Sequence, residues 1–570
     1  MASSGSLLPA KNPVARVLQV LKLDKKEIWS VYFYAILSGL INLSLPLGIQ
    51  SIISFVLGGS ISTSLVILII LVVLGVFLGG MVQVNQMKII EKVQQKIFLR
   101  YSFEYAHRIP RLDLKSVDQY YLPEMVNRFF DTVSLQKGVS KLLLDIPTAT
   151  IQILFGLILL SFYHPIFIVF SLLLVAIVFF ILYYSGNRGL QTSLEESNYK
   201  YGVAAWIEEL ARVVRSFKFS KVTLLNLRRT DELVSGYLDA RTGHFRILLF
   251  QYWTLVLFKV LITAAMLIVG SVLLINQQLN LGQFIAAEIV ILLVLSSVEK
   301  LIMNLDKVYD VLTSVDKLGK VIDKPLDPEG EVVMPRTSKG MKIQARNLSF
   351  RYDDKKVLDD ISFEVLAGRK IAVMGADGSG KSTLLRLLSG VFTDYDGGLL
   401  ADDVPLRNYL GDSYRQQAGM LLQQQDIFYG TLMENITMGD TNVRPEDIMH
   451  LANNVGLSDF LQSQDHGFST MLDPVGKRLS RSVIQKILLL RALVNHPRLL
   501  LLEEPWRGLE EDNRVRIQEY LIDDCPHATV LVESNDETFA RRADEVMIFE
   551  QGKLAYFGPW EGFRKSSLNY

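Results

Sequence analysis

The chain of 570 residues contains unusually long stretches without charge. From Ile28 to Met87 there is no Asp, Glu, Lys or Arg. A helix that crosses a bilayer needs about 20 apolar residues, so this stretch is long enough for two crossings. The glycines and serines of LGGSIST, Leu57 to Thr63, predict the turn between them. The first part of the chain is therefore expected to lie in a membrane.

A second uncharged stretch and a later apolar region predict four more crossings. Ile146 to Gly186 holds two of them, divided at FYHP, Phe162 to Pro165, because proline cannot continue a helix without losing a backbone hydrogen bond. The last pair lies near Ile247 to Ile275 and Gly282 to Met303, separated by NQQLNLGQ. Six crossings are therefore expected.

The distribution of Lys and Arg predicts the orientation of these crossings. Lys11, Arg16 and Lys22 precede the first crossing, and the segment from Lys88 to Lys141 is rich in basic residues, whereas the three short turns carry none. Because basic residues gather on the cytoplasmic side, both termini are expected in the cytoplasm. The first apolar stretch is too long for a signal peptide, so a multi-pass protein of the inner (plasma) membrane is expected.

Long charged stretches separate the crossings on the basic side. They cover about residues 88–145 and 187–246, where apolar residues recur at helical spacing, and they are expected to extend the membrane helices into the cytoplasm. Inside the crossings, Lys259 and Glu288 are ionisable and are not expected to pair with each other. Lys259 either reaches toward the interface or lines a cavity, and Glu288 is the stronger candidate for a substrate or gating contact.

The composition changes after residue 322. A cytoplasmic segment (1–27) and the membrane domain (28–322) are followed by a polar linker with three prolines (323–340) and by a region with the pattern of a soluble α/β domain (341–570). In that region the apolar strand KIAVM precedes GADGSGKST, Gly375 to Thr383, and a helical LLRLLSG follows. This is the GxxxxGK[ST] pattern of a phosphate-binding loop in its expected setting. The predicted fold class is thus an all-α six-helix transmembrane domain followed by an α/β P-loop nucleotide-binding domain.

Each residue type in the loop suits a phosphate ligand. Glycines let backbone N–H groups approach the phosphates, Lys381 attracts the terminal phosphates, and the Ser382 hydroxyl can bind magnesium. ATP and Mg²⁺ are therefore the expected cofactors. The loop residues assigned to ATP binding are Gly375, Asp377, Gly378, Ser379, Gly380, Lys381, Ser382 and Thr383.

A pair of carboxylates follows later in the chain. RLLLLEEP, Arg498 to Pro505, is an apolar strand that ends in two glutamates. A strand end beside a phosphate loop is where a magnesium-orienting carboxylate and a water-activating carboxylate are placed. Glu503 is assigned the first role, acting through water, and Glu504 is the expected catalytic residue.

Charge and cysteine content argue against other classes of protein. Basic and acidic residues balance at 59 each, so no global field attracts nucleic acid. The single cysteine, Cys525, excludes an intrachain disulfide and a cysteine-based metal cluster. It is expected to pack as a small hydrophobic residue.

Together these motifs resemble an ATP-binding cassette (ABC) exporter half-transporter, and the resemblance covers nearly the whole chain. Tyr352 in LSFRY matches the residue that stacks on adenine. Gln423 in LLQQQDIFYGTLMENI matches the glutamine that binds magnesium and senses the membrane domain. In this family two cassettes sandwich two ATP molecules, so the resemblance implies a second half-transporter as partner, in a homodimer or a heterodimer.

One apolar stretch, Leu45 to Leu68, resembles the transporters of type I secretion in particular. This resemblance implies a peptide or protein substrate, with a periplasmic adaptor and an outer-membrane channel as partners; lipids and drugs stay open as substrates. Many such relatives carry an N-terminal peptidase-like domain. About 27 residues precede the first crossing here, and Cys525 lies in the cassette, so leader cleavage by a cysteine is not expected.

The sequence departs from the family where the partner's phosphates are met. The signature LSGGQ aligns with LSRSV, in which Ser480 is retained for ATP binding while Arg481 and Ser482 replace glycines. Side chains at these positions obstruct the approach of the backbone to the γ-phosphate. Asn535 in TVLVESND takes the place of the switch histidine, and it can hydrogen-bond but cannot carry a proton.

Two smaller departures from the family accompany those at Arg481, Ser482 and Asn535. Glu503 stands where the family has Asp, and RGLE, Arg507 to Glu510, replaces SALD. ATP binding with slow hydrolysis is therefore expected. Two functions stay open at this point: an ATP-driven exporter that closes on ATP and reopens after hydrolysis, and a membrane scaffold or regulatory subunit that binds ATP without routine turnover.

Overall fold

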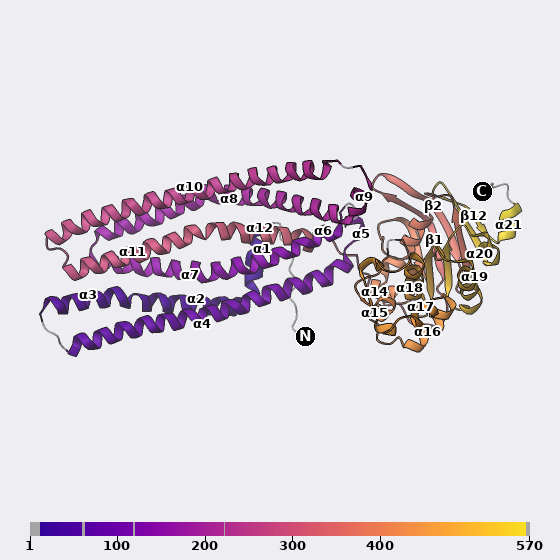
Figure 1. Cartoon of the computed structure of the whole chain (residues 1–570), viewed down its shortest axis with the longest axis horizontal. Coiled ribbons are helices and arrows are strands. Elements are labelled where there is room, and N and C mark those ends of the chain that lie inside the picture. The colour runs from indigo at the N-terminus through magenta and orange to yellow at the C-terminus, as the bar shows by residue number, and fades with distance from the viewer. Residues whose placement is uncertain (1–11, 60–62, 118–119, 222, 424, 566–570) are drawn as a thin grey trace. The chain divides into compact units, whose positions relative to one another are not determined.

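A computed structural model describes residues 12–59, 63–117, 120–221, 223–423 and 425–565. The chain forms two compact units. The first comprises Met1–Leu112 and Val117–Pro325, and the second comprises Asp113–Ser116 and Leu326–Tyr570. In Figure 1 the helices of the first unit run from indigo to magenta, and the sheets of the second lie among orange and yellow helices. The predicted fold class is confirmed.

Helices make up the regular structure that is described for the first unit. Among the described residues, six segments are long and apolar enough to cross a membrane, which confirms the predicted number: Lys25–Leu57, Thr63–Arg111, Leu122–Tyr163, Ile166–Arg212, Leu225–Ile275 and Leu281–Ile322. The helices are α1 (Pro13–Lys22), α2 (Lys25–Asn42), α3 (Ser44–Leu57), α4 (Thr63–Arg108), α6 (Leu122–Val126), α7 (Asp131–Tyr163), α8 (Ile166–Arg212), α9 (Val214–Phe219), α10 (Leu225–Ile275), α11 (Leu281–Met303) and α12 (Leu305–Ile322), with α5 (Leu114–Val117) at the boundary of the two units.

The helix breaks have local causes. Between α7 and α8 lie only His164 and Pro165, in agreement with the proline break predicted there. At the start of α11 the Asn280 side chain accepts a hydrogen bond from the Gln283 N–H, and Gln283 bonds back to the Asn280 N–H, which forms a capping box. The predicted turn at 57–63 lies partly outside the described residues.

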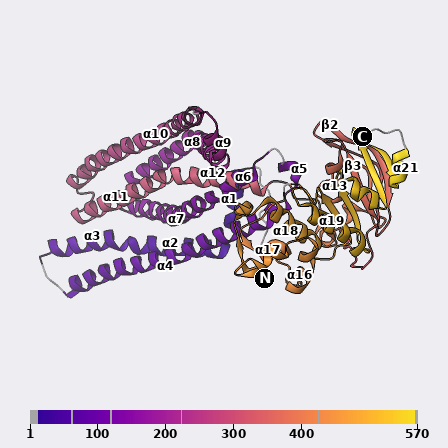
Figure 2. The same cartoon turned by 45° about the vertical axis from the view of Figure 1, so that its right-hand side comes forward.

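The charged stretches continue the apolar helices. α4 and α8 run without interruption from apolar into charged sequence, and α10 runs from charged into apolar sequence, as predicted. α8 packs along α10, and α7 packs along α11 (Figures 1 and 2). Each of these long helices buries one stripe against its neighbour, while the opposite face stays apolar over the membrane-spanning part.

The ionisable residues of the crossings have different surroundings. Lys259 Nζ lies 2.5 Å from Glu299 Oε2 of α11, so Lys259 has an ion-pair partner that neither alternative from the sequence included. The pair neutralises two charges that would be costly alone in an apolar region. Among the described residues Lys259 pairs with Glu299 and not with Glu288, whose Oε2 is buried without a hydrogen bond.

The second unit contains three sheets. A four-stranded antiparallel sheet has the order β2-β1-β4-β5, a six-stranded sheet has the order β12-β11-β3-β10-β9-β6, and β7 pairs with β8. In the six-stranded sheet all strands are parallel except β12. The strands are β1 (Ile343–Tyr352), β2 (Lys355–Val365), β3 (Lys370–Gly375), β4 (Asp396–Ala401), β5 (Val404–Pro405), β6 (Ala418–Leu421), β7 (Gly430–Thr431), β8 (Met471–Leu472), β9 (Leu499–Glu503), β10 (Thr529–Glu533), β11 (Glu545–Glu550) and β12 (Lys553–Gly558).

Strands β3, β9 and β10 are buried along their whole length. Parallel strands covered on both faces are continuous apolar runs, which explains KIAVM and LLLL. Because these strands run parallel and in register, their carboxyl ends meet at one edge of the sheet, and that edge positions the candidate site. The α-helices of this unit are α13 (Lys381–Leu388), α14 (Gly411–Arg415), α15 (Leu432–Thr437), α16 (Pro445–Asn454), α17 (Ser458–Gln462), α18 (Arg481–Leu493), α19 (Glu511–Glu519), α20 (Glu537–Arg542) and α21 (Trp560–Lys565).

Cys525 lies near this core. It is partly buried and packs against the apolar side chains of the six-stranded sheet and its helices, as predicted. Burial raises the pKa of its thiol above the ordinary value, so the thiol stays protonated and unreactive at neutral pH.

Candidate nucleotide-binding site

The phosphate loop connects the end of β3 to the start of α13. Gly378 (φ 77°) and Gly380 (φ 105°) adopt left-handed backbone conformations that favour glycine. A Cβ atom at Gly380 would also lie 2.6 Å from Leu358 Cδ2. The motif glycines therefore allow a turn that leaves the backbone N–H groups at the N-terminus of α13 free to face an anion.

The loop lysine and serine already have partners. Lys381 is buried, and its Nζ donates to the carbonyl oxygens of Gly375 (2.6 Å) and Ala376 (2.9 Å). Ser382 Oγ donates to Glu533 Oε1 at 2.9 Å. Both side chains are thus held in place, and both bonds are of the kind that phosphate oxygens and a metal ion can replace.

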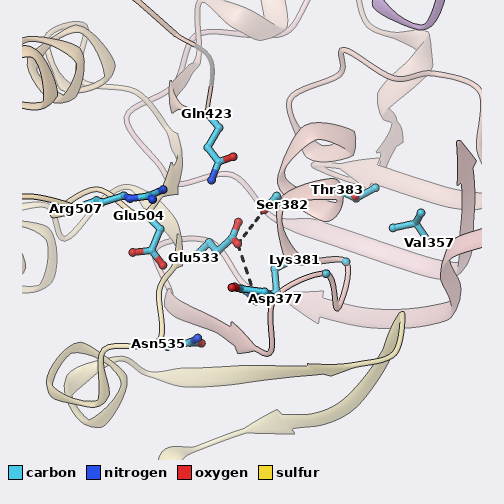
Figure 3. A pocket seen from close by; sticks show the side chains of 12 residues that line it. Val357, Asp377, Lys381, Ser382, Thr383, Gln423, Glu504, Arg507, Glu533 and Asn535 are labelled. Atoms are coloured by element: carbon cyan, nitrogen blue, oxygen red, sulfur yellow. Dashed lines mark hydrogen bonds and ion pairs between the residues drawn. The ribbon is translucent and has the colours of Figure 1, made fainter. Parts of the chain in front are cut away.

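A cavity of about 530 Å³ adjoins the loop (Figure 3). It brings together residues from the phosphate loop, the ends of β9 and β10, and the segment after β6. The site residues predicted from the sequence that line it are Asp377, Gly378, Gly380, Lys381, Ser382, Thr383, Gln423, Glu504 and Asn535. Hydroxyl, amide and carboxylate oxygens converge here, and this donor set suits Mg²⁺.

Other predicted residues lie outside the lining of the cavity. Tyr352 packs edge-on against Phe350 (centroids 4.9 Å apart) and Phe392 (5.6 Å). Gly375 is in contact with Lys381 and Asn535, and the Ser379 side chain is buried. Ser480 lies on a separate segment, as expected for a residue assigned to the partner's nucleotide. The roles of these residues stay predictions.

The two glutamates at the end of β9 differ in environment. Glu503 is 3% exposed, and its Oε2 accepts a hydrogen bond from the Gln423 N–H at 2.7 Å. Glu504 has a left-handed backbone (φ 45°), and Gln485 Nε2 donates to its carbonyl oxygen at 3.1 Å. Burial raises the pKa of the Glu504 carboxyl, while the Arg507 and Lys381 charges oppose that rise. A raised pKa suits a carboxylate that accepts a proton from water.

Asn535 is engaged with the start of the loop. Its Oδ1 accepts from the Gly375 N–H at 3.1 Å, and its Nδ2 donates to the Gly375 carbonyl at 3.3 Å. Both polar atoms of the amide are therefore used on the backbone of one glycine. The second N–H of Nδ2 is the donor that Asn535 can offer to a γ-phosphate while both of these bonds are kept.

The altered signature segment forms a regular helix start. Ser480 is the N-cap of α18, and its Oγ accepts from the Val483 N–H at 3.2 Å. Arg481 is the first residue of the helix and is exposed. The N-terminus of the helix is thus capped, and the exposed Arg481 side chain stands at its first position.

Three cavity residues were not assigned from the sequence: Val357, Arg507 and Glu533. Arg507 was noted only as a departure from the family motif. Glu533 is the last residue of β10, as Glu503 is the last residue of β9. The sequence signal that could have identified Glu533 is an apolar run followed by Glu, which occurs in both LLLLE and TVLVE. Burial and the neighbouring charge of Glu503 raise the pKa of Glu533 to about 7.

Comparison with known families agrees with this geometry. The ABC transporter transmembrane region matches residues 28–298, and the ABC transporter domain matches residues 358–507. Together these regions cover most of the chain. The protein belongs to the ABC transporter family.

Its relatives include translocators of bacterial toxins. The exotoxin translocation ATP-binding protein PaxB of Pasteurella aerogenes is 29% identical over 292 residues, which are 51% of this chain and 41% of PaxB. The alpha-hemolysin translocation ATP-binding protein HlyB of Escherichia coli is 28% identical, and the leukotoxin translocation ATP-binding protein LktB of Mannheimia haemolytica is 29% identical, with the same shares covered. The alignments thus span less than half of each relative.

A solved structure has the same fold over nearly the whole chain. A bacterial Atm1-family ABC exporter with ATP bound superposes with a TM-score of 0.85 at 18% identity, covering 95% of this chain and 97% of that chain. At this level of identity the likeness shows the architecture of the chain, in which a helical membrane region precedes the nucleotide-binding domain.

Proposed function

We propose that this protein is one half of an ATP-driven exporter that binds Mg²⁺-ATP in the cavity beside its phosphate loop and works as a dimer. The observation that carries the proposal is the convergence of Lys381, Gln423 and Glu504 on one cavity, in a chain with six helices able to cross a membrane. A second half-transporter, identical or different, completes each ATP site with its Ser480 segment.

Each residue of the site has its own role in ATP binding and hydrolysis. Lys381 exchanges its bonds to the Gly375 and Ala376 carbonyls for bonds to phosphate oxygens. Mg²⁺, when bound, neutralises charge that develops on the phosphates. Ser382, Gln423 and Glu503 would hold the metal, Glu503 through water, while Glu504 orients and deprotonates the attacking water.

Hydrolysis in this exporter is slow. Arg481 adds a charged side chain where a glycine backbone would approach the γ-phosphate, and Asn535 lacks the proton-carrying ring of histidine. Loss of one preorganised contact to the transition state lowers turnover by roughly 10²–10³-fold. Arg481 and Asn535 lie on one chain, so a homodimer carries both changes in both sites, whereas a heterodimer with an intact partner carries one in each.

The exporter belongs to the secretion group of the family and lies in the inner (plasma) membrane with both termini in the cytoplasm. The similarity to PaxB, HlyB and LktB supports a peptide or protein substrate, and with it a periplasmic adaptor and an outer-membrane channel as partners. The absence of basic residues from the three short turns of the membrane domain supports the orientation.

Magnesium-dependent ATP hydrolysis by the purified protein in lipid nanodiscs tests this function, with Glu504→Gln measured beside the wild type. We expect slow hydrolysis that Glu504→Gln lowers at least about 100-fold while ATP binding is kept, because the amide cannot accept the proton of water. Tight ATP binding with no Glu504-dependent turnover, alone or with a second cassette chain, would contradict the exporter and favour the scaffold.

A further inference from the structure

The nucleotide cavity contains an acidic residue without an assigned role. Glu533 of β10 is the Cα partner of Glu503 of β9 in the parallel ladder. Residues opposite each other on neighbouring strands point to the same face of a sheet. Glu533 is 5% exposed and Glu503 is 3% exposed, so two buried carboxyl groups lie side by side where three strand ends meet.

Each of these carboxyl groups is satisfied at one oxygen only. Glu533 Oε1 accepts from Ser382 Oγ at 2.9 Å and lies 3.9 Å from Lys381 Nζ, and Glu503 Oε2 accepts from the Gln423 N–H. Glu533 Oε2 and Glu503 Oε1 are buried with no hydrogen-bond donor among the described residues. An unpartnered buried carboxylate oxygen is costly, so the pair has two oxygens that a positively charged ligand would stabilise.

The neighbouring Lys381 and Arg507 donate no hydrogen bond to the two free carboxylate oxygens, Glu533 Oε2 and Glu503 Oε1, among the described residues. Lys381 Nζ donates to two backbone carbonyls, and its distance of 3.9 Å from Glu533 is too long for a hydrogen bond. Glu504 and Asp377 also line the cavity with carboxyl groups, and Arg507 lies on the same wall as Glu504 (Figure 3). Burial is the main reason that the Glu533 pKa is raised, and the nearby charge of Glu503 raises it further.

The free oxygens form a donor set for a hard divalent cation. Mg²⁺ and Mn²⁺ prefer carboxylate, hydroxyl and amide oxygens. Glu533 and Ser382 line the cavity together with Gln423, and Glu503 lies next to Glu533 on the neighbouring strand, so the site offers two carboxylates and one hydroxyl. Two carboxylates balance the charge of one divalent cation, so this protein supplies the negative charge that nucleotide phosphates would otherwise bring.

We propose that Glu533, together with Glu503 and Ser382, binds a divalent cation before the nucleotide arrives. Glu533 is then a ligand that retains the metal at the site and makes nucleotide binding dependent on it, because an unoccupied Glu533 carboxylate repels the phosphates. This inference rests on the proposed Mg²⁺-ATP site and adds the order in which its ligands bind.

Titration of the nucleotide-free protein with Mn²⁺ tests the proposal, with bound metal measured by the loss of the free Mn²⁺ signal in electron paramagnetic resonance. The full chain in nanodiscs is expected to bind one Mn²⁺ that Mg²⁺ displaces. Glu533→Val, which continues the apolar strand, is expected to weaken this binding at least about 10-fold. Glu533→Gln keeps the shape of the side chain and is expected to weaken it as well.

The matched control is Glu550→Gln. Glu550 ends β11 of the same sheet but is exposed, so Mn²⁺ binding should not change. A fluorescent ATP analogue without metal, measured on the same samples, should bind Glu533→Val more tightly than the wild type, and this also reports on folding. No Mn²⁺ binding by the wild type, or Mn²⁺ affinity in both Glu533 variants equal to that of the wild type, would overturn the inference. Failure of the wild type to bind nucleotide with Mg²⁺ would instead count against the proposed function, and the Mn²⁺ result would still decide this inference.

Discussion

Within the candidate site, the phosphate loop and the residues around it differ in how closely they follow the sequence patterns of the family. The loop from Gly375 to Thr383 keeps every residue of its motif, and its glycines adopt the backbone that the motif requires. Around it, Glu503, Asn535 and Arg481 stand where the sequence predicts departures from the family, and Glu533 adds a buried carboxyl group. We therefore expect nucleotide binding to be retained and the contacts that speed hydrolysis to be changed.

Removing the lysine of the phosphate loop tests whether this loop, which keeps its motif, binds the nucleotide. Lys381→Ala deletes the charge that pairs with the phosphates, and we expect Mg²⁺-ATP affinity to fall on the order of 100-fold, since charge-assisted bonds contribute about 1.5–3 kcal/mol each. A fluorescent ATP analogue titrated into nanodisc samples measures this. The control is Lys553→Ala, a largely exposed lysine in the same domain. Unchanged affinity in Lys381→Ala would show that this cavity is not the nucleotide site.

Introducing the family residues around the loop tests whether the residues present there slow hydrolysis. We expect Arg481→Gly and Ser482→Gly, combined with Asn535→His, to raise ATP turnover on the order of 10-fold or more while affinity changes little. Steady-state hydrolysis in nanodiscs measures the effect.

The matched control for this restoration is Arg478→Ala, an exposed arginine of the same segment. The two glycines at the start of α18 cost helix stability of about 1 kcal/mol each, so a thermal melt accompanies the assay. Equal turnover before and after restoration in a folded protein would mean that Glu503, Glu533 or the partner chain limits the rate.

The sequence predicted local features more completely than contacts between residues that lie far apart in the chain. Pro165 and the uncharged stretches predicted the breaks and number of the membrane helices, and GADGSGKST predicted the loop, because each signal lies within a few adjacent residues. The ion pair of Lys259 with Glu299 depends on how two helices pack, which no periodicity gives. The pairing of Glu533 with Glu503 likewise depends on strand order and register.

The smallest expected effect concerns the adenine end of the site. Tyr352 ends β1, is partly buried and packs edge-on against two phenylalanines, so its ring is held in place. Aromatic stacking contributes about 0.5–1.5 kcal/mol, and Tyr352→Ala should therefore weaken ATP binding by about 3- to 10-fold, far less than Lys381→Ala. Because stacking needs a ring and not a hydroxyl, Tyr352→Phe should bind like the wild type. Equal losses in the Phe and Ala variants would assign the effect to the hydroxyl group, and no loss in either would place the adenine elsewhere. The comparison of ATP with inorganic triphosphate separates base from phosphate: Tyr352→Ala should leave triphosphate binding unchanged, whereas Lys381→Ala should weaken both ligands alike.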